Sequence, residues 1–258
     1  EKHLYPSKAP HRSMPYAFSQ RPNKIKHNNG DFLWSPYLCS MSIAENLHQV
    51  LSTIPPKVSL VAVSKTKPEE DLIAAYNAGQ RIFGENKIQE MTRKQESLPK
   101  DIEWHMIGHV QSNKVKYMAP YVNLIHGVDR EKLLKEINKQ AAKNDRVIDC
   151  LLQMHIAQEE TKFGLDAGEL EQIIKNALAG AYPNVRLVGL MGMATFTPDQ
   201  NQIRAEFAQL KQYFDKAANQ LEHCSVLSMG MSGDYLIAIE EGSTMIRVGS
   251  KIFGERNY

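Results

Sequence analysis

From residue 57 the sequence alternates short apolar runs with longer amphipathic stretches. Short Val-rich runs are typical of strands buried on both faces of a parallel sheet. The eight runs are VSLVAV (58–63), RIFG (81–84), EWHMIG (103–108), VNLIHGV (122–128), VIDCLLQMHI (147–156), VRLVGLMGM (185–193), SVLSMG (225–230) and MIRVG (245–249).

A stretch with helical character follows each run. These stretches begin near Glu69, Lys87, Gln111, Arg130, Ala167, Asp199, Gly233 and Ser250. Strands that alternate with helices indicate a parallel sheet covered by helices, and eight such pairs indicate a closed (β/α)8 barrel. The sequence therefore predicts an α/β fold with a single TIM barrel. An open doubly wound sheet is the alternative, but the Gly-rich first turn typical of that fold is missing.

The chain before the first strand falls into two parts. Residues 1–40 lack periodicity, contain five prolines, and hold six Lys/Arg against two acids. We expect them to be a disordered extension. This extension could be a targeting peptide, but we favour an expression artefact or translation from upstream of the native start. Residues 41–258 then form the barrel, with an extra N-terminal helix over 42–53 that has Ser42 as N-cap and Glu45 three residues later.

The composition excludes several classes of protein. No apolar run is long enough to cross a bilayer, and a net charge of +2 gives little attraction to nucleic acid or to anionic membranes. The cysteines Cys39, Cys150 and Cys224 are too far apart for a zinc site or a disulfide framework. We expect a cytoplasmic protein without nucleic-acid or membrane partners.

A lysine follows the first predicted strand in the stretch LVAVSKTKP. In this barrel the carboxyl ends of the strands form the active-site face, so Lys65 would lie there among apolar strands. Partial desolvation would favour its neutral, nucleophilic amine. The alternative is a surface lysine beyond a strand end. Lys67 precedes Pro68 and the first helix, and we expect it to point to solvent.

Other polar residues follow the carboxyl ends of the remaining strands. The loops after the seventh and eighth strands often bind phosphate in such barrels, and here they contain Ser232, Gly249 and Ser250. Ordinary turn and capping chemistry is the alternative. Asn86 follows the second strand. Arg247 lies inside the apolar eighth strand, where a charge should be paired or face a ligand.

The histidines do not indicate a metal site. His105 and His109 have the spacing of two helical zinc ligands, but they fall on a strand and a turn, and no Glu sits beside His105. His126 and His155 are better explained as core or rim residues. We therefore expect neither a metal nor a Walker, GxGxxG or GxSxG motif to carry the function.

Seven motifs in order resemble the YggS/PROSC family of pyridoxal 5′-phosphate (PLP) homeostasis proteins. They are AVSKTKP, FGENKIQE, WHMIGHVQSNK, EETKFGL, GLMGMAT, LSMGMSGD and STMIRVGSKIFGERNY. The resemblance covers the chain from about residue 43 to its end. It implies a fold similar to the N-terminal barrel of alanine racemase.

The resemblance also assigns roles to residues. It implies PLP held as a Schiff base on Lys65, with Ser232, Gly249 and Ser250 at the phosphate. Arg247 would face the pyridine nitrogen, and Asn86 would lie near the ring. Two positions depart from the family pattern. Ser250 replaces a common Thr, which keeps the hydroxyl, and Lys87 replaces the Tyr of GENY, which leaves the role of that Tyr in doubt.

Two functions are compatible with this resemblance. The first is a monomeric carrier that buffers PLP or delivers it to PLP-dependent apo-enzymes without turnover. The second is a PLP-dependent amino-acid racemase. An arginine at the ring nitrogen weakens the electron sink, and racemisation needs a second acid–base group opposite Lys65. The partner domain that supplies it in alanine racemase is not expected here, so we favour the carrier. A barrel for an unrelated phosphorylated metabolite, with Lys65 unmodified, is a third class.

Overall fold

A computed structural model gives the structure of the chain and describes residues 41–159 and 163–255. The compact unit that contains the barrel is Met41–Tyr258. The expected disordered extension, residues 1–40, lies outside the described residues.

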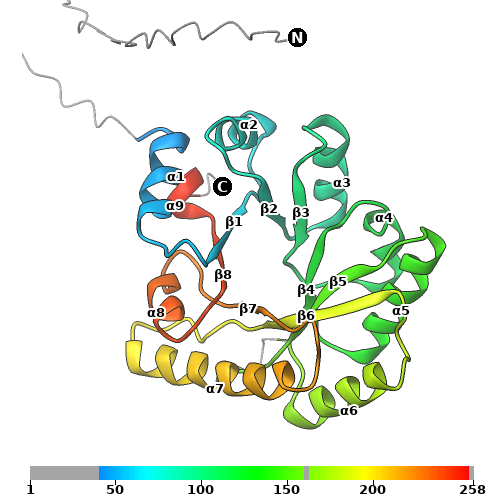
Figure 1. Cartoon of the computed structure of the whole chain (residues 1–258). Coiled ribbons are helices and arrows are strands. Elements are labelled where there is room, and N and C mark those ends of the chain that lie inside the picture. The colour runs from blue at the N-terminus through cyan, green and yellow to red at the C-terminus, as the bar shows by residue number, and fades with distance from the viewer. Residues whose placement is uncertain (1–40, 160–162, 256–258) are drawn as a thin grey trace, which may run out of the picture. The chain divides into compact units, whose positions relative to one another are not determined.

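Eight parallel strands close into a barrel in chain order, β1 to β8, and β8 pairs with β1 (Figure 1). This confirms the predicted TIM barrel. The strands are β1 (Ser59–Val63), β2 (Ile82–Glu85), β3 (Glu103–Met106), β4 (Leu124–Val128), β5 (Ile148–Gln153), β6 (Val185–Met191), β7 (Val226–Ser228) and β8 (Met245–Val248).

Helices surround this barrel in the described part of the chain. They are α1 (Ile43–Ser52), α2 (Glu69–Asn77), α3 (Ile88–Ser97), the 3-10 turn η1 (Ser112–Lys114), α4 (Val115–Met118), α5 (Glu131–Lys143), α6 (Ala167–Leu178), α7 (Gln200–Ala218), α8 (Tyr235–Glu240) and α9 (Ser250–Phe253). None of these helices is long and apolar enough to cross a membrane.

The extra helix α1 begins where the sequence predicts it. Ser42 accepts a hydrogen bond from the backbone N–H of Glu45, and the Glu45 carboxylate accepts one from the Ser42 N–H at 2.7 Å. This capping box satisfies two N–H groups that the helix itself cannot. Asn46 then donates to the carbonyl of Ile252 at 3.1 Å, which holds α1 beside α9 (Figure 1).

Several elements are shorter than the sequence pattern indicates, and two of them matter for the site. The fifth strand ends at Gln153 rather than at Ile156; Met154 still donates its N–H to the Met191 carbonyl of β6 at 2.8 Å and forms an isolated bridge to Leu165. His155 is consequently exposed beyond the strand end. The helix expected from Gln111 is reduced to η1 and the single turn of α4.

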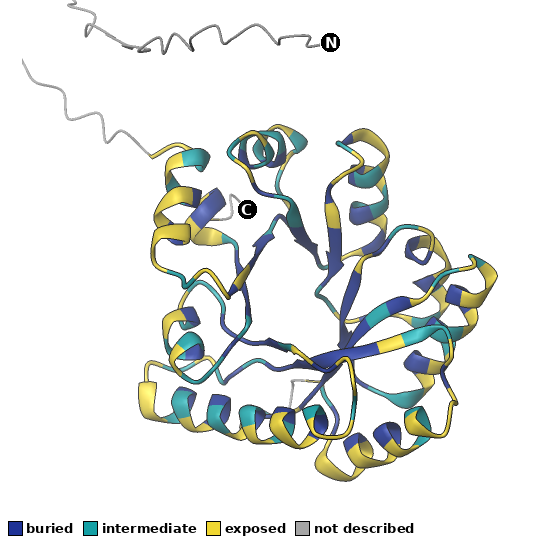
Figure 2. Ribbon diagram, viewed as in Figure 1, coloured by how far each residue is buried: buried dark blue, intermediate teal, exposed yellow. Residues whose placement is uncertain are grey.

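The core has two layers separated by the strands. A large outer cluster lies between strands and helices, so that in Figure 2 the strands are mostly buried while the outer helix faces are exposed. A smaller cluster fills the barrel interior, as expected for a TIM barrel whose centre is packed by side chains. Its buried members are Val61, Leu124, Leu151, Val188, Met191 and Met245.

Close approach of β6 to β7 depends on a glycine. A Cβ atom on Gly189 would collide with the backbone carbonyl oxygen of Val226. We predict that Gly189→Ala lowers the free energy of unfolding by about 3 kcal/mol, because overpacking forces the two paired strands apart. Urea denaturation measures this change.

Gly168 in α6 supplies the matched control for that substitution. A Cβ there would meet only the Asp166 carboxylate, at 3.4 Å. Gly168→Ala should therefore be neutral or slightly stabilising. Equal effects of the two substitutions would contradict this account of the β6–β7 contact.

Candidate functional site

A cavity of about 480 Å³ opens at the carboxyl end of the barrel strands. It lies on the face where TIM barrels place their active sites. The residues singled out from the sequence all line this cavity: Lys65, Asn86, Ser232, Arg247, Gly249 and Ser250. They come from four separate parts of the chain, and closure of the barrel brings them together.

Lys65 lies two residues beyond the end of β1, and its neighbours are fixed by hydrogen bonds. Ser64 continues the strand pairing through its N–H to the carbonyl of Gly84, at 3.1 Å. Thr66 has a φ of 64°, which is uncommon for a β-branched residue. Its N–H donates to Glu90 Oε1 at 2.7 Å. The contacts on both sides hold the backbone of Lys65 in one position.

Lys94 of α3 is the centre of these contacts, and its side chain is fully buried. Its ammonium group donates three hydrogen bonds of 2.8 Å, to the carbonyl of Ser64, to Glu85 Oε1 and to Glu90 Oε1. An ammonium carries three N–H donors, so its capacity is used in full. We call Lys94, Glu85 and Glu90 the carboxylate–lysine clamp.

Glu85 at the end of β2 completes the clamp inside the protein. Its Oε1 also accepts the hydroxyl hydrogen of Ser64 at 2.7 Å, whereas its Oε2 is buried without a hydrogen-bond partner among the described residues. Burial raises the pKa of Glu85, and the adjacent Lys94 ammonium opposes that rise. The clamp thus joins β2 and α3 to the backbone that carries Lys65.

Arg247 projects from β8 into the cavity and is only 4% exposed. Its guanidinium donates to the Ser228 hydroxyl at 2.7 Å, to the Ser228 carbonyl at 3.0 Å and to the Gly192 carbonyl at 3.2 Å. Burial lowers the pKa of Arg247 to about 10, while Asp234 acts in the opposite direction. Arg247 therefore remains a charged donor at neutral pH, and these uncharged acceptors fix its direction.

The loops after β7 and β8 meet at one edge of the cavity. Gly249 donates its N–H to the Ser232 hydroxyl at 3.2 Å, which ties the two loops together. The N–H groups of Ser232, Gly233 and Ser250 donate to no acceptor within the described residues. Several unused backbone donors beside two hydroxyls suit a bound anion such as a phosphate group.

Two glycines allow the backbone to approach closely around the site. A Cβ on Gly249 would come within 3.1 Å of the Val63 carbonyl oxygen, where β8 passes the end of β1. A Cβ on Gly108 would lie 2.5 Å from the carbonyl oxygen of Asn86. Gly108 thereby lets the loop after β3 support the backbone of Asn86 at the cavity edge.

The expectation that Lys67 points to solvent is wrong. Its ammonium donates to the carbonyls of Phe253 at 2.7 Å and Glu255 at 3.1 Å, just beyond the end of α9. Lysines commonly bind the carbonyls left without partners at a helix end. Lys67 therefore fastens the loop after β8 to the loop after β1, although it also lines the cavity.

The histidines lie away from this cavity or at its outside. His126 is fully buried in the barrel interior, as expected for a core histidine, and His155 is exposed at the rim. His109 pairs with Asp129 at 2.8 Å and stacks on Phe163. His105 is buried on β3.

Sequence reasoning missed the carboxylate–lysine clamp. Glu90 and Lys94 have the i, i+4 spacing of an exposed helical ion pair, which makes them look like a solvated face. One sequence feature could have indicated the clamp: Glu85 is a carboxylate at the end of the second strand, directly before Asn86.

The clamp can be tested by removing its cation. We predict that Lys94→Met lowers the free energy of unfolding by about 3–5 kcal/mol, because Glu85 is left as a buried, uncompensated carboxylate. Adding Glu85→Gln to that variant should recover part of the loss. Urea denaturation gives both values.

The exposed Lys175 of α6 provides a control, since Lys175→Met should change the free energy of unfolding by less than about 0.5 kcal/mol. A comparably small loss in Lys94→Met would mean that the clamp does not hold the structure.

Known proteins are similar to this chain in both sequence and fold. Residues 39–257 match the family model described as alanine racemase, N-terminal domain. The pyridoxal phosphate homeostasis protein of Aquifex aeolicus is 41% identical over 204 residues, which cover 77% of this chain and 87% of that protein. The protein of the same name from Escherichia coli is 37% identical, over 84% of this chain and 97% of the relative.

Solved structures agree with these relatives. The structure of PipY from Synechococcus elongatus with PLP bound has a TM-score of 0.75 and 35% identity, and covers 83% of this chain and 100% of that chain. Alanine racemase from Streptomyces coelicolor, at 17% identity and a TM-score of 0.69, shares the fold. The chain therefore belongs to the alanine racemase N-terminal-domain family and, within it, to the pyridoxal phosphate homeostasis proteins.

Proposed function

We propose that this chain binds PLP and takes part in PLP homeostasis, holding the cofactor at the carboxyl end of the barrel. The observation that carries the proposal is the convergence of a lysine, a buried arginine and a group of unused N–H donors on one cavity. The relatives named as homeostasis proteins and the PLP-bound PipY structure support it.

Each group in the cavity suits one part of this cofactor. The Lys65 amine would hold PLP through a C=N bond to its aldehyde carbon, with water as the leaving group. Ser232 and Ser250 would bind the phosphate through their N–H groups and hydroxyls, and Gly249, whose N–H donates to the Ser232 hydroxyl, lets the backbone approach the phosphate closely. Arg247 would face the pyridine nitrogen and donate a hydrogen bond to its lone pair. Asn86, which lines the same cavity, would lie beside the ring.

The residues lining the cavity favour a carrier over a racemase. Racemisation needs an acid–base group on each face of the substrate carbon, and Lys65 supplies one. Among the described residues that line the cavity, none is a tyrosine or a histidine. The Arg247 guanidinium can only donate, so it cannot accept a hydrogen bond from a protonated pyridine nitrogen, which is the form of the ring that acts as the strong electron sink. Lys67 and Asp234 also line the cavity, but Lys67 is held by the carbonyls at the end of α9, and we favour a carrier that holds PLP without turnover.

The proposal extends to partners and location. A carrier of this kind works as a monomer and passes PLP to PLP-dependent apo-enzymes. Cys150 and Cys224 are buried free thiols. Free thiols fit a reducing compartment such as the cytoplasm.

Lys65 and Lys67 provide a matched pair of variants. Purified Lys65→Ala, mixed with PLP, should show no absorption band that borohydride removes, because it lacks the amine that forms the C=N bond. Lys67→Ala should keep that band, since Lys67 donates to two carbonyls at the end of α9. Loss of the band in Lys67→Ala with retention in Lys65→Ala would reverse the assignment.

The phosphate contacts can be tested separately from the covalent anchor. The double variant Ser232→Ala/Ser250→Ala should raise the dissociation constant for PLP about tenfold or more, because two hydrogen bonds to a charged group are lost. Equilibrium dialysis measures this constant. Ser97→Ala, which alters an exposed hydroxyl on α3, is the control and should bind normally. Equal affinity of the double variant and the control would remove both hydroxyls from the phosphate site.

A further inference from the structure

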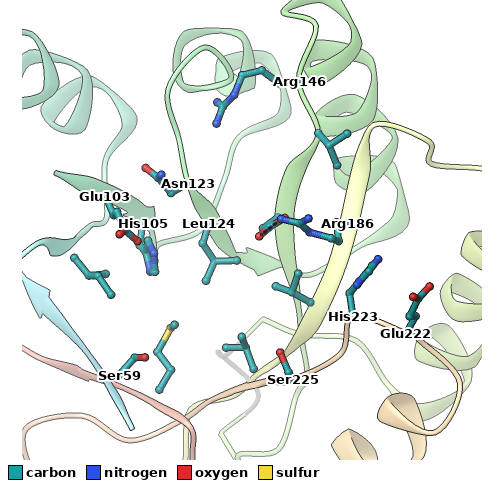
Figure 3. A pocket seen from close by; sticks show the side chains of 16 residues that line it. Ser59, Glu103, His105, Asn123, Leu124, Arg146, Arg186, Glu222, His223 and Ser225 are labelled. Atoms are coloured by element: carbon teal, nitrogen blue, oxygen red, sulfur yellow. Dashed lines mark hydrogen bonds and ion pairs between the residues drawn. The ribbon is translucent and has the colours of Figure 1, made fainter. Parts of the chain in front are cut away.

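A second cavity, of about 730 Å³, lies at the opposite mouth of the barrel (Figure 3). Each of the eight strands contributes its first or second residue to the lining, so this is the amino-terminal end of the sheet. The volume falls in the range of small-molecule sites. The packed inner cluster of the barrel separates this cavity from the one that contains Lys65.

A line of hydrogen bonds crosses that packed interior between the two cavities. Arg247 donates to the Ser228 hydroxyl at 2.7 Å, and Ser228 Oγ lies 3.1 Å from His126 Nδ1. His126 Nε2 then lies 3.1 Å from His105 Nδ1. His105 lines the second cavity, where its ring is visible between Glu103 and Leu124. We call these four residues the interior chain.

Arg247 favours one direction for the hydrogen bonds of the interior chain. The guanidinium can only donate, so the Ser228 oxygen accepts from it. Among the described residues the Ser228 hydroxyl hydrogen then has one acceptor, His126 Nδ1. Burial lowers the pKa of His105 to about 3 and that of His126 well below its usual value, so both rings are neutral and each carries one hydrogen. In the arrangement that uses the Ser228 hydroxyl hydrogen, His126 Nε2 donates to His105 Nδ1.

In that arrangement the hydrogen of His105 sits on Nε2. This nitrogen donates to no acceptor among the described residues, although the residue is only 3% exposed. His105 Nε2 is not among the fully buried atoms without a partner, so this donor opens to the cavity that its side chain lines, which is of ligand size. A ligand with a hydrogen-bond acceptor, such as a carboxylate, would therefore suit the His105 Nε2 donor in this cavity.

The charged residues around the cavity indicate which charges a ligand should carry. Arg186 and Asp149 neutralise each other through two hydrogen bonds, of 2.7 and 2.9 Å. Arg146 donates to two backbone carbonyls and contributes a positive charge. Glu103 and Glu222 form no ion pair with a described residue, and both are exposed. A ligand that carries both a carboxylate and an ammonium group matches this mixture of charges.

We propose that the amino-terminal cavity binds a small zwitterion of the amino-acid type, whose carboxylate accepts the His105 Nε2 hydrogen bond, and that the interior chain transmits its presence to Arg247. The ammonium group of the ligand lies near Glu103 and Glu222. Hydrogen bonds in a chain polarise and strengthen one another, so an acceptor at His105 holds Arg247 more firmly in its direction. This second part rests on the proposed PLP function, whereas the binding itself does not.

Binding is tested on protein freed of PLP. The twenty proteinogenic L-amino acids are titrated one at a time by calorimetry, and any that binds is compared with its decarboxylated amine and its deaminated acid. At least one amino acid should bind with a millimolar or lower dissociation constant, the acid more weakly, and the amine not measurably. Absence of binding by every amino acid, or equal binding by the amine, would overturn the site. Equal binding by the acid would overturn the zwitterion assignment.

Variants locate the ligand in the cavity. Glu103→Gln/Glu222→Gln alters only exposed side chains and should weaken amino-acid binding about tenfold while leaving the deaminated acid unaffected. Glu70→Gln, an exposed substitution on α2, is the matched control. His105→Leu should abolish binding, and His105→Gln should restore part of it by supplying an N–H donor. An unchanged dissociation constant in Glu103→Gln/Glu222→Gln would mean that the amino acid binds outside this cavity. This result does not depend on whether the His105 variants fold.

Transmission is tested on the PLP-loaded protein. The bound amino acid should slow PLP release about fivefold in the natural chain, and Ser228→Ala, which interrupts the interior chain, should remove that effect. Amino-acid binding that leaves the release rate unchanged, or that changes it equally in Ser228→Ala, would overturn the transmission. A chain that never retains PLP would refute the proposed function instead, because the titration of PLP-free protein is independent of it.

Discussion

The pairing of β1 with β8 is the constraint on which the site depends. Val61 lies opposite Arg247 in this ladder, so the first and last strands of the barrel become neighbours. Parallel strands in a closed barrel end at one face, and the loop after β1 therefore meets the loops after β7 and β8. The cavity that contains Lys65 is the direct consequence of that closure. Lys67 reinforces it with hydrogen bonds to the end of α9.

Buried charged side chains hold the cavity at the carboxyl end of the barrel, and one of them, Arg247, also begins the interior chain. At the carboxyl end the carboxylate–lysine clamp fixes the backbone around Lys65, so that a flexible side chain starts from a rigid point. Arg247, held by Ser228 and Gly192, is a fixed positive group in the same cavity. Its donor character also favours one hydrogen-bond direction in the interior chain. One buried arginine thus relates the cofactor cavity to the amino-terminal cavity.

Local sequence was sufficient to predict the barrel and the residues around its cavity, but not how they are held. The eight apolar runs and the lysine, serines and arginine at their ends follow from strand periodicity and from the active-site face of the fold. Burial of Lys94 depends on how α3 packs on β2, and its spacing from Glu90 is that of a surface pair. The orientation of Lys67 depends on the distant end of α9. The amino-terminal cavity depends on the side chains of eight strands together, which no single run reveals.

The central claim is that Lys65 is the covalent anchor of PLP. Its most direct test is a visible spectrum of the natural chain loaded with PLP, before and after borohydride, followed by peptide mass mapping. The account predicts a band that borohydride removes and a pyridoxyl mass on the peptide containing Lys65. A chain that develops no such band with PLP, or a pyridoxyl mass on a different lysine, would contradict it.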